Sequence, residues 1–154
     1  MIPIALLLIA QLPEPAAPVI ADPAAVLDAW HLAAAQCDEG RYFGLLAENA
    51  IFLGTDAEER WSKPEFRAWA APYFKRGKAW SFKAVRRKVV RSAEGSVAWF
   101  EESLDTPNLG PARGSGVLVK EGKGWRIALY DLSVPIPNAL FKDVKALLDK
   151  AAKK

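Results

Sequence analysis

The sequence is poor in the residue types that bind metals and cross-link chains. Its 154 residues include one cysteine, Cys37, and one histidine, His31. A single cysteine cannot form a disulfide within the chain, and a single histidine excludes a metal site built from several histidines. We therefore expect no metal and no cofactor. Any catalysis would then depend on carboxylates, the one histidine and hydrogen-bond donors.

Long hydrophobic runs are also scarce. Residues 1–10 (MIPIALLLIA) form an apolar run that is shorter than the roughly 20 residues a helix needs to cross a bilayer. The run has the length of a secretory signal core, although it has no Lys or Arg, and Val19-Ile20-Ala21 has the spacing of a cleavage site. We expect residues 1–21 to be a signal peptide, without a stable membrane anchor. The protein would then be exported (periplasmic or secreted), and cytoplasmic if the segment is not cleaved but merely lacks structure.

The chain has no strong excess of charge of either sign. Lys and Arg number 21 and Asp and Glu 18, which gives a net charge of +3, and 51% of the residues are hydrophobic. These proportions are typical of a soluble globular domain and exclude a disordered chain, a collagen-like repeat and a multi-span membrane protein. A basic stretch at residues 86–91 has the composition of a solvated strand face, and RNA-binding aromatic motifs are missing, so we expect no nucleic-acid partner.

Apolar residues recur at helical spacing in the first third of the chain. Asp22-Pro23 is a suitable start for a helix that would end near Gly40, and a second, short helix is expected over residues 42–47. Residues 51–53 are typical of a buried strand. The capping box at residues 62–65 then predicts a third helix that would end near residue 77.

The spacing then changes to that of strands. We expect long strands over residues 79–91, 97–106, 113–120 and 125–134. The alternation slips at residues 86–88, which predicts a bulge. A last helix, capped by Asn138, would carry Phe141, Val144, Leu147 and Leu148 on one face. The sequence thus predicts an α+β domain over residues 22–137 and a basic amphipathic helix over residues 138–154.

Several segments resemble those of one superfamily in their amino-acid sequence and in their order along the chain. AENAIFLG at residues 47–54 and GWRIALYDLSVP at 124–135 are similar to the first and last strands of nuclear transport factor 2-like proteins. WHLAAAQCD at 30–38, GTDAEERW at 54–61 and PYF at 72–74 resemble the SnoaL-like branch, over about residues 23–137. The resemblance implies a cone in which three N-terminal helical segments pack in a curved antiparallel β-sheet around an apolar pocket, followed here by the C-terminal helix.

The fold alone does not imply an activity, because it serves isomerases, cyclases, hydrolases, dehydratases and non-catalytic binding or assembly domains. By the resemblance, the oxyanion-donating tyrosine of ketosteroid isomerases falls at Trp30 and their base at Gly54. Glycine cannot abstract a proton, so that chemistry is disfavoured unless Asp56 replaces the base. The last strand also resembles the association domain of calcium/calmodulin-dependent kinase, with Leu129 and Asp131 in place of its histidine pair.

Two residues are candidates for acid–base catalysis. His31 could act inside a pocket, and its alternative is a hydrogen-bonded boundary histidine. Asp56 lies in an acidic segment between a strand and a helix. Arg60 would pair with Asp56 or bind an anion, and Trp61 would form part of the pocket wall. The alternative for this segment is a solvated turn in which Trp61 only packs against the next helix.

Six tryptophans in so short a chain point to a pocket as well as a core. We expect Tyr42, Trp61, Trp80 and Trp99 to contribute to binding. Glu101 would share the face of Trp99, where an apolar wall could raise its pKa, and its alternative is a solvent-facing or ion-paired carboxylate. Arg113 would pair with Glu101 or receive an anion.

The sequence leaves three functions open. The leading one is a non-catalytic domain, or one of unknown activity, that binds a small apolar or amphipathic molecule and forms a homodimer through its sheet. The second is a cofactor-independent isomerase, cyclase or hydrolase with Asp56 or His31 as the general base. The third is a structural or oligomerisation module. Whether the chain is an enzyme is not decided by its sequence.

Overall fold

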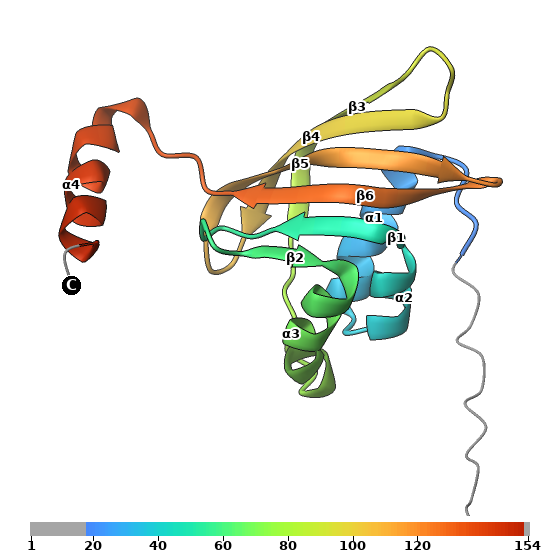
Figure 1. The fold of residues 1–154 in the computed structure, drawn as a ribbon, viewed down its shortest axis with the longest axis horizontal. Coiled ribbons are helices and arrows are strands. Elements are labelled where there is room, and N and C mark those ends of the chain that lie inside the picture. Colours follow the sequence, from blue (N-terminus) through green and yellow to red (C-terminus); the bar gives the residue numbers. More distant parts are fainter. Residues whose placement is uncertain (1–17, 153–154) are drawn as a thin grey trace, which may run out of the picture.

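The computed structural model describes residues 18–152, and residues 1–17 of the predicted signal peptide lie outside the described residues. Helices and strands follow one another as in Figure 1. The helices are α1 (Pro23–Ala35), α2 (Glu39–Gly44), α3 (Lys63–Lys75), the short 3-10 helix η1 (Asn138–Leu140) and α4 (Phe141–Ala151). The strands are β1 (Leu46–Leu53), β2 (Arg60–Ser62), β3 (Lys83–Arg91), β4 (Val97–Thr106), β5 (Gly110–Glu121) and β6 (Gly124–Ser133).

The strands form one sheet in the order β2-β1-β6-β5-β4-β3. Neighbouring strands are antiparallel except β1 and β6, which run parallel with Phe52 opposite Tyr130. The sheet is therefore mixed, which corrects the expectation of a wholly antiparallel one. A bulge is present in β3, but just before the predicted residues 86–88, because the pairing with β4 shifts register between Ala84 and Arg86.

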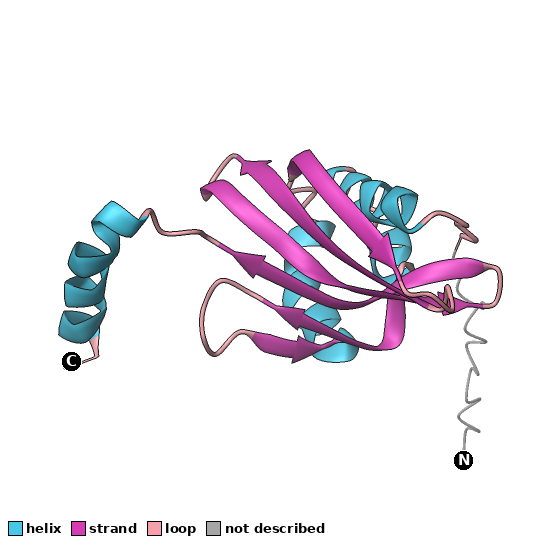
Figure 2. Ribbon diagram, turned by 90° about the horizontal axis from the view of Figure 1, so that it is seen from above, coloured by secondary structure: helices cyan, strands magenta, loops and turns pink. Residues whose placement is uncertain are grey.

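Helices α1, α2 and α3 lie against one face of the curved sheet (Figures 1 and 2). The core lies between these two layers, and its largest fully buried side chains include Trp30, Tyr42, Phe43, Phe66 and Tyr130. α4 stands apart at the end of β6 (Figure 2), and none of its residues is buried. This arrangement is the α+β cone that the resemblance implied, with the additional C-terminal helix.

The first helix begins where the sequence predicts. Asp22 caps α1 by accepting a hydrogen bond from a backbone amide at 3.3 Å. α1 ends at Ala35 rather than near Gly40, because Cys37 adopts a positive φ of 55° and Asp38 caps the start of α2. Asparagine and glycine are the usual residues at such positions, so the sequence does not mark this end clearly.

The prediction of a helix over residues 42–47 is wrong in its bounds. α2 ends at Gly44, and residues 46–50 belong to β1, since Leu46 pairs with Ile127 of β6. Residues 79–82, expected in a strand, form a loop before β3. This loop matters because it forms one wall of the cavity described next.

Candidate functional site

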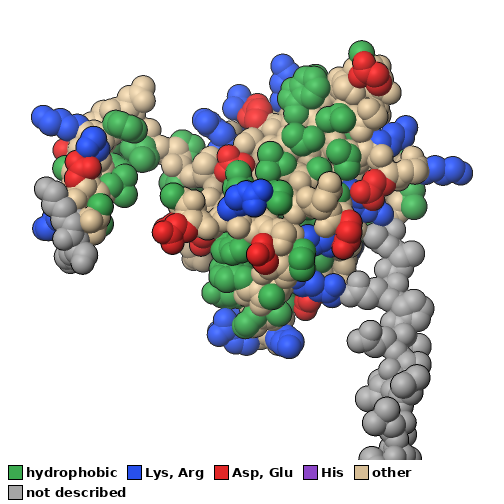
Figure 3. Space-filling view, in the orientation of Figure 1, with side chains coloured by type: hydrophobic (Ala, Val, Ile, Leu, Met, Phe, Trp, Pro, Cys, Tyr) green, Lys and Arg blue, Asp and Glu red, His purple; other side chains and the backbone are tan. Residues whose placement is uncertain are grey.

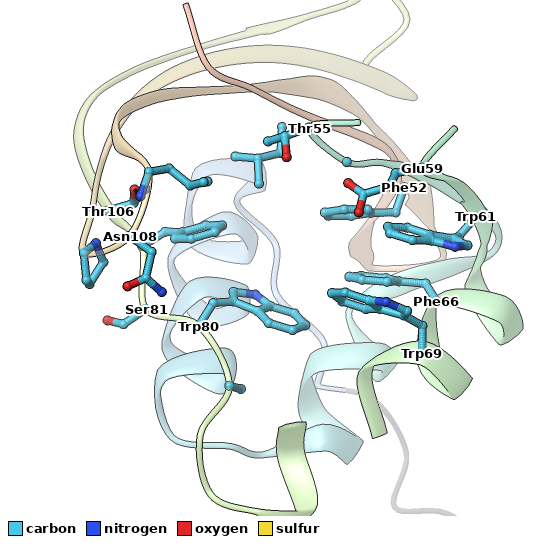
Figure 4. Close-up of a pocket in the computed structure, with 16 residues that line it drawn as sticks. Phe52, Thr55, Glu59, Trp61, Phe66, Trp69, Trp80, Ser81, Thr106 and Asn108 are labelled. Carbon is cyan, nitrogen blue, oxygen red and sulfur yellow. Dashed lines mark hydrogen bonds between the residues drawn. The ribbon is translucent and has the colours of Figure 1, made fainter. Parts of the chain in front are cut away.

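A cavity of about 460 Å³ lies between α3, the end of β1, the loop before β3 and the turn from β4 to β5 (Figure 4). Its volume lies within the range of about 300–1,000 Å³ that is usual for small-molecule sites. We call it the aromatic cavity, because six rings form most of its wall. They are Phe52, Trp61, Phe66, Trp69, Trp80 and Phe82.

Most of these rings lie nearly parallel to one another. Phe52 and Phe66 have ring centroids 4.0 Å apart and planes at 15°, and Trp61 and Phe66 are at 5.7 Å and 11°. Trp69 stacks on Trp61 at 5.0 Å, and Trp80 lies 5.9 Å from Phe66 with its plane at 22° (Figure 4). Offset stacking is favourable between aromatic systems, so this array offers flat surfaces to a flat apolar guest.

Few polar side chains reach the aromatic cavity. They are Thr55, Glu59, Ser81, Thr106 and Asn108 (Figure 4). The Thr106 hydroxyl already donates to a backbone carbonyl at 2.9 Å and accepts from a backbone amide at 3.1 Å, which fixes the turn after β4. The cavity is therefore mainly apolar, with a small number of groups that could orient a guest.

Glu59 is the acidic group of the aromatic cavity. Its carboxylate accepts a hydrogen bond from the Asp56 amide at 3.1 Å and lies over Gly54. A Cβ at position 54 would overlap this carboxylate, so a larger residue there would displace the Glu59 side chain from its present position. The Glu59 carboxylate thus occupies the space that a side chain at position 54 would fill.

A buried polar cluster lies under the sheet, and Glu102 on β4 is at its centre. Glu102 is fully buried, and its Oε1 lies 2.7 Å from Nε2 of His31 on α1. The Tyr130 hydroxyl donates to the same oxygen at 2.8 Å, and Nε of Arg87 donates to Oε2 at 2.7 Å. Arg87 also donates to Asp28 at 2.5 Å. Each oxygen of the buried carboxylate is therefore hydrogen-bonded and the charge is paired.

The neighbours of Glu102 determine its charge state. Burial by itself would raise the pKa of Glu102, but the hydrogen bonds and charges of His31 and Arg87 lower this pKa below its ordinary value. The pKa of Tyr130 is raised, first by burial and then by the Glu102 charge. Tyr130 therefore remains a neutral donor beside an ionised carboxylate.

The cluster opens on a second, shallower cavity rather than on the aromatic one. This second cavity measures about 290 Å³ and is lined by His31 together with Asp28, Lys83 and Arg87. Phe82 lines both cavities and separates them. Over residues 18–152, no group of three or more His, Cys, Asp or Glu side chains could hold a metal ion. Within the same range, no helix has the length and apolar character needed to cross a membrane.

The comparison with protein families shows to which family the chain belongs. The model of the SnoaL-like domain family matches residues 24–137, which is most of the chain. The chain belongs to the SnoaL-like domain family. Among curated proteins, none matches this SnoaL-like domain.

Solved structures support the fold at low sequence identity. A nuclear transport factor 2-like protein of unknown function from Pseudomonas putida is 14% identical, with a TM-score of 0.63 over 75% of this chain and 85% of its own. A protein of the same superfamily from Streptomyces avermitilis, provisionally named a dehydratase, is 14% identical, with a TM-score of 0.64 over 74% and 94%.

A third structure, from Xanthomonas campestris, is provisionally named a calcium/calmodulin-dependent protein kinase II association domain. It is 21% identical, with a TM-score of 0.56 over 79% of this chain and 94% of its own. These likenesses show that the SnoaL-like domain shares its fold with structures described as nuclear transport factor 2-like, and they show the fold alone.

The structure distributes the predicted site residues of the SnoaL-like domain over different places. Trp61 and Trp80 line the aromatic cavity, and His31 lines the second cavity. Asp56 does not line either cavity: it accepts a hydrogen bond from the Glu58 amide at 2.9 Å and shapes its own loop. Arg60 is an exposed residue of β2.

One further residue of the predicted set, Tyr42, lies in the core instead of a cavity wall. Tyr42 is fully buried, with its ring stacked 4.6 Å from that of Trp30. Trp30, at the position of the isomerase donor, is also buried, and its Nε1 has no hydrogen-bond partner within the described residues. Neither residue lines the aromatic cavity.

The remaining predicted residues lie on the outward face of the sheet. Trp99 is 49% exposed, and Glu101 pairs with Arg86 at 3.4 Å rather than with Arg113. Arg113 is exposed and lies opposite Ser103 and Ser133 in the sheet. The expected position of Glu101 in a pocket is therefore corrected, because successive residues of β4 point to opposite faces and Glu101 is on the outer one.

Sequence reasoning missed Glu102 and Glu59. The signal for Glu102 is the alternation in β4, where Ala98, Phe100 and Leu104 share its face and are all buried. The sequence gives no comparable signal for Glu59, because its position depends on how residues 54–59 close over the end of β1.

Proposed function

We propose that this SnoaL-like domain binds a flat apolar or amphipathic small molecule in the aromatic cavity, and that binding rather than catalysis is its main role. The array of nearly parallel rings from Phe52 to Trp80 is the observation that carries this proposal. A guest that lies against the ring surfaces facing the cavity gains both buried apolar area and aromatic contacts.

The position of the buried polar cluster favours binding over catalysis. His31 and Glu102 are the histidine and carboxylate best placed for acid–base chemistry, but His31 lines the second cavity. Glu102 has no exposed surface, and its oxygens are taken by His31, Tyr130 and Arg87. A group so fully engaged stabilises the core and is not free to exchange a proton with a guest in the aromatic cavity.

A neutral aromatic dye tests the binding proposal. N-phenyl-1-naphthylamine carries a flat naphthalene ring and is uncharged, so the Glu59 carboxylate does not repel it, and its fluorescence rises in apolar surroundings. We expect saturable binding, weakened about tenfold by Trp80→Ala, since a lost ring removes both apolar area and a stacking contact. Titration of the protein into the dye gives the dissociation constant.

Trp99→Ala is the matched control, because Trp99 is half-exposed on the outward face of the sheet. We expect it to bind the dye as the original protein does. Equal weakening by both substitutions, or dye binding that Trp80→Ala leaves unchanged, would contradict the assignment to the aromatic cavity.

A second candidate function is supported by Glu59. Its carboxylate lies over Gly54 and lines the aromatic cavity, beside the rings that would hold a guest. A carboxylate beside a bound apolar molecule can act as a general base, so a cofactor-independent isomerase, cyclase or hydrolase would use Glu59, in place of the Asp56 expected from the sequence.

Proton exchange tests this second function. 2-Tetralone is a flat ketone with acidic protons next to its carbonyl, and their exchange with deuterium is followed by NMR. If Glu59 is a base, the domain accelerates exchange and Glu59→Gln lowers the rate by about a hundredfold, the low end of general-base contributions. Asp56→Asn, which lies outside the cavity lining, should leave the rate unchanged. Absence of acceleration, or an equal loss in both variants, removes this function.

A further inference from the structure

The C-terminal helix has an apolar face that nothing in the described structure covers. Phe141 is 61% exposed, Leu147 68% and Leu148 63%, and no residue of α4 is buried. An exposed cluster of large apolar side chains on an otherwise well-packed protein marks a surface that binds something.

Apolar and charged residues are separated around α4. At 100° per residue, the helix places Phe141, Val144, Leu147 and Leu148 in one arc and its lysines and aspartates in the other. Figure 3 shows the same division, with hydrophobic side chains gathered on one side of this helix and basic ones on the other. Strong segregation with little overall hydrophobicity is the pattern of helices that lie in a membrane interface.

The net charge of the chain is concentrated in the same segment. Residues 138–154 contain five lysines and two aspartates, and the remaining 16 basic and 16 acidic residues of the chain cancel one another. The whole excess of +3 therefore belongs to the C-terminal segment. Its complement is an anionic surface, and lysines beside such a surface each strengthen binding by about fivefold.

The linker before the helix is not packed into the core. Residues 134–137 include Pro135 and Pro137, and all four are exposed. The hydrophobic side of α4 is turned toward the body in Figure 3 but is not covered by it. Rotation about this linker would present the helix to a surface without breaking any contact of the core.

We propose that α4 docks reversibly on an anionic lipid surface, with Phe141, Leu147 and Leu148 in the interface and its lysines toward the headgroups. The helix acts as a peripheral contact that brings the SnoaL-like domain to the membrane, independently of what its aromatic cavity binds. Because the helix is short, docking depends on both contributions, the apolar side chains and the charge.

Vesicle flotation of the full chain tests the proposal. We expect binding to vesicles of phosphatidylglycerol and phosphatidylcholine, little binding to phosphatidylcholine alone, and loss of binding in about 1 M NaCl, where the Debye length is about 3 Å. Leu147→Glu with Leu148→Glu should reduce the bound fraction at least about tenfold. Lys142→Gln with Lys150→Gln should also weaken it; Lys145 is left unchanged because it pairs with Asp149 at 2.6 Å.

Val85→Glu is the matched control, since Val85 is also 63% exposed but lies on β3. It should bind vesicles like the original chain, whereas binding that remains in the Leu147→Glu, Leu148→Glu variant would measure the contribution of residues 1–10. Equal binding by the Leu147→Glu, Leu148→Glu variant, equal binding to both vesicle types, or no binding by the original chain overturns the proposal. A dimer that this double variant dissociates, without vesicle binding, would instead show that a second copy covers α4.

Discussion

At the scale of single residues, two adjacent glutamates of β4 have opposite environments. Glu102 points inward, is fully buried and is bonded to His31, Tyr130 and Arg87. Glu101 points outward and makes a longer, exposed pair with Arg86. An exposed pair contributes about 0–1 kcal/mol, whereas breaking a buried one costs about 3–5 kcal/mol.

The lowered pKa of Glu102 predicts a specific dependence of stability on pH. A carboxyl whose pKa is lower in the folded state stabilises the fold above its unfolded pKa, about 4.3, and loses this contribution as the pH falls through its folded pKa. Glu102→Gln should therefore be less stable than the original protein at pH 7, and this difference should shrink in acid. Urea denaturation between neutral pH and pH of about 3 measures it.

Glu101→Gln provides the control for this prediction. Its pair with Arg86 is exposed, so the substitution should change the free energy of unfolding by less than about 1 kcal/mol at any pH. A difference for Glu102→Gln that stays constant with pH would mean that packing, rather than charge, explains the loss.

At the scale of elements, β5 makes room for the buried cluster because Gly114 has no side chain. A Cβ at Gly114 would overlap the Tyr130 hydroxyl and approach the Glu102 carboxylate closely. Gly114→Ala should therefore separate these two groups and lower the free energy of unfolding by about 1–3 kcal/mol, the usual range for overpacking. Ser115→Ala, on the outward face of the same strand, should have little effect, and equal losses would contradict this role of Gly114.

Local patterns in the sequence predict most elements but not how distant elements meet. The long strands β4, β5 and β6 and the start of α3 follow from alternation, turns and the capping box, and all are confirmed. The parallel pairing of β1 with β6 and the short β2 depend on contacts between distant residues, which no local spacing reveals. Trp61 and Trp80 could be expected at a cavity from the sequence. The outward position of Trp99 could not, because it depends on the register of the sheet.

At the scale of the whole molecule, the buried core and the net charge lie in two different parts of the chain. The body formed by α1 to β6 holds every core residue, while the C-terminal segment holds the net charge. The amphipathic helix expected over residues 138–154 is present as η1 followed by α4, but the expected cap is wrong, because Asn138 is the first residue of η1 and neither helix has a side-chain cap.

The short stretch ahead of α1 is held by β6 and by the core. The Trp125 amide donates to the Ile20 carbonyl at 3.1 Å, Arg126 donates to the Pro18 carbonyl at 3.3 Å, and Ile20 packs against the core. A processing enzyme that cuts after Ala21 would find these residues already held by β6 in the finished fold. Cleavage after Ala21 would therefore remove the hydrogen bonds that the Trp125 amide and Arg126 make to the Ile20 and Pro18 carbonyls.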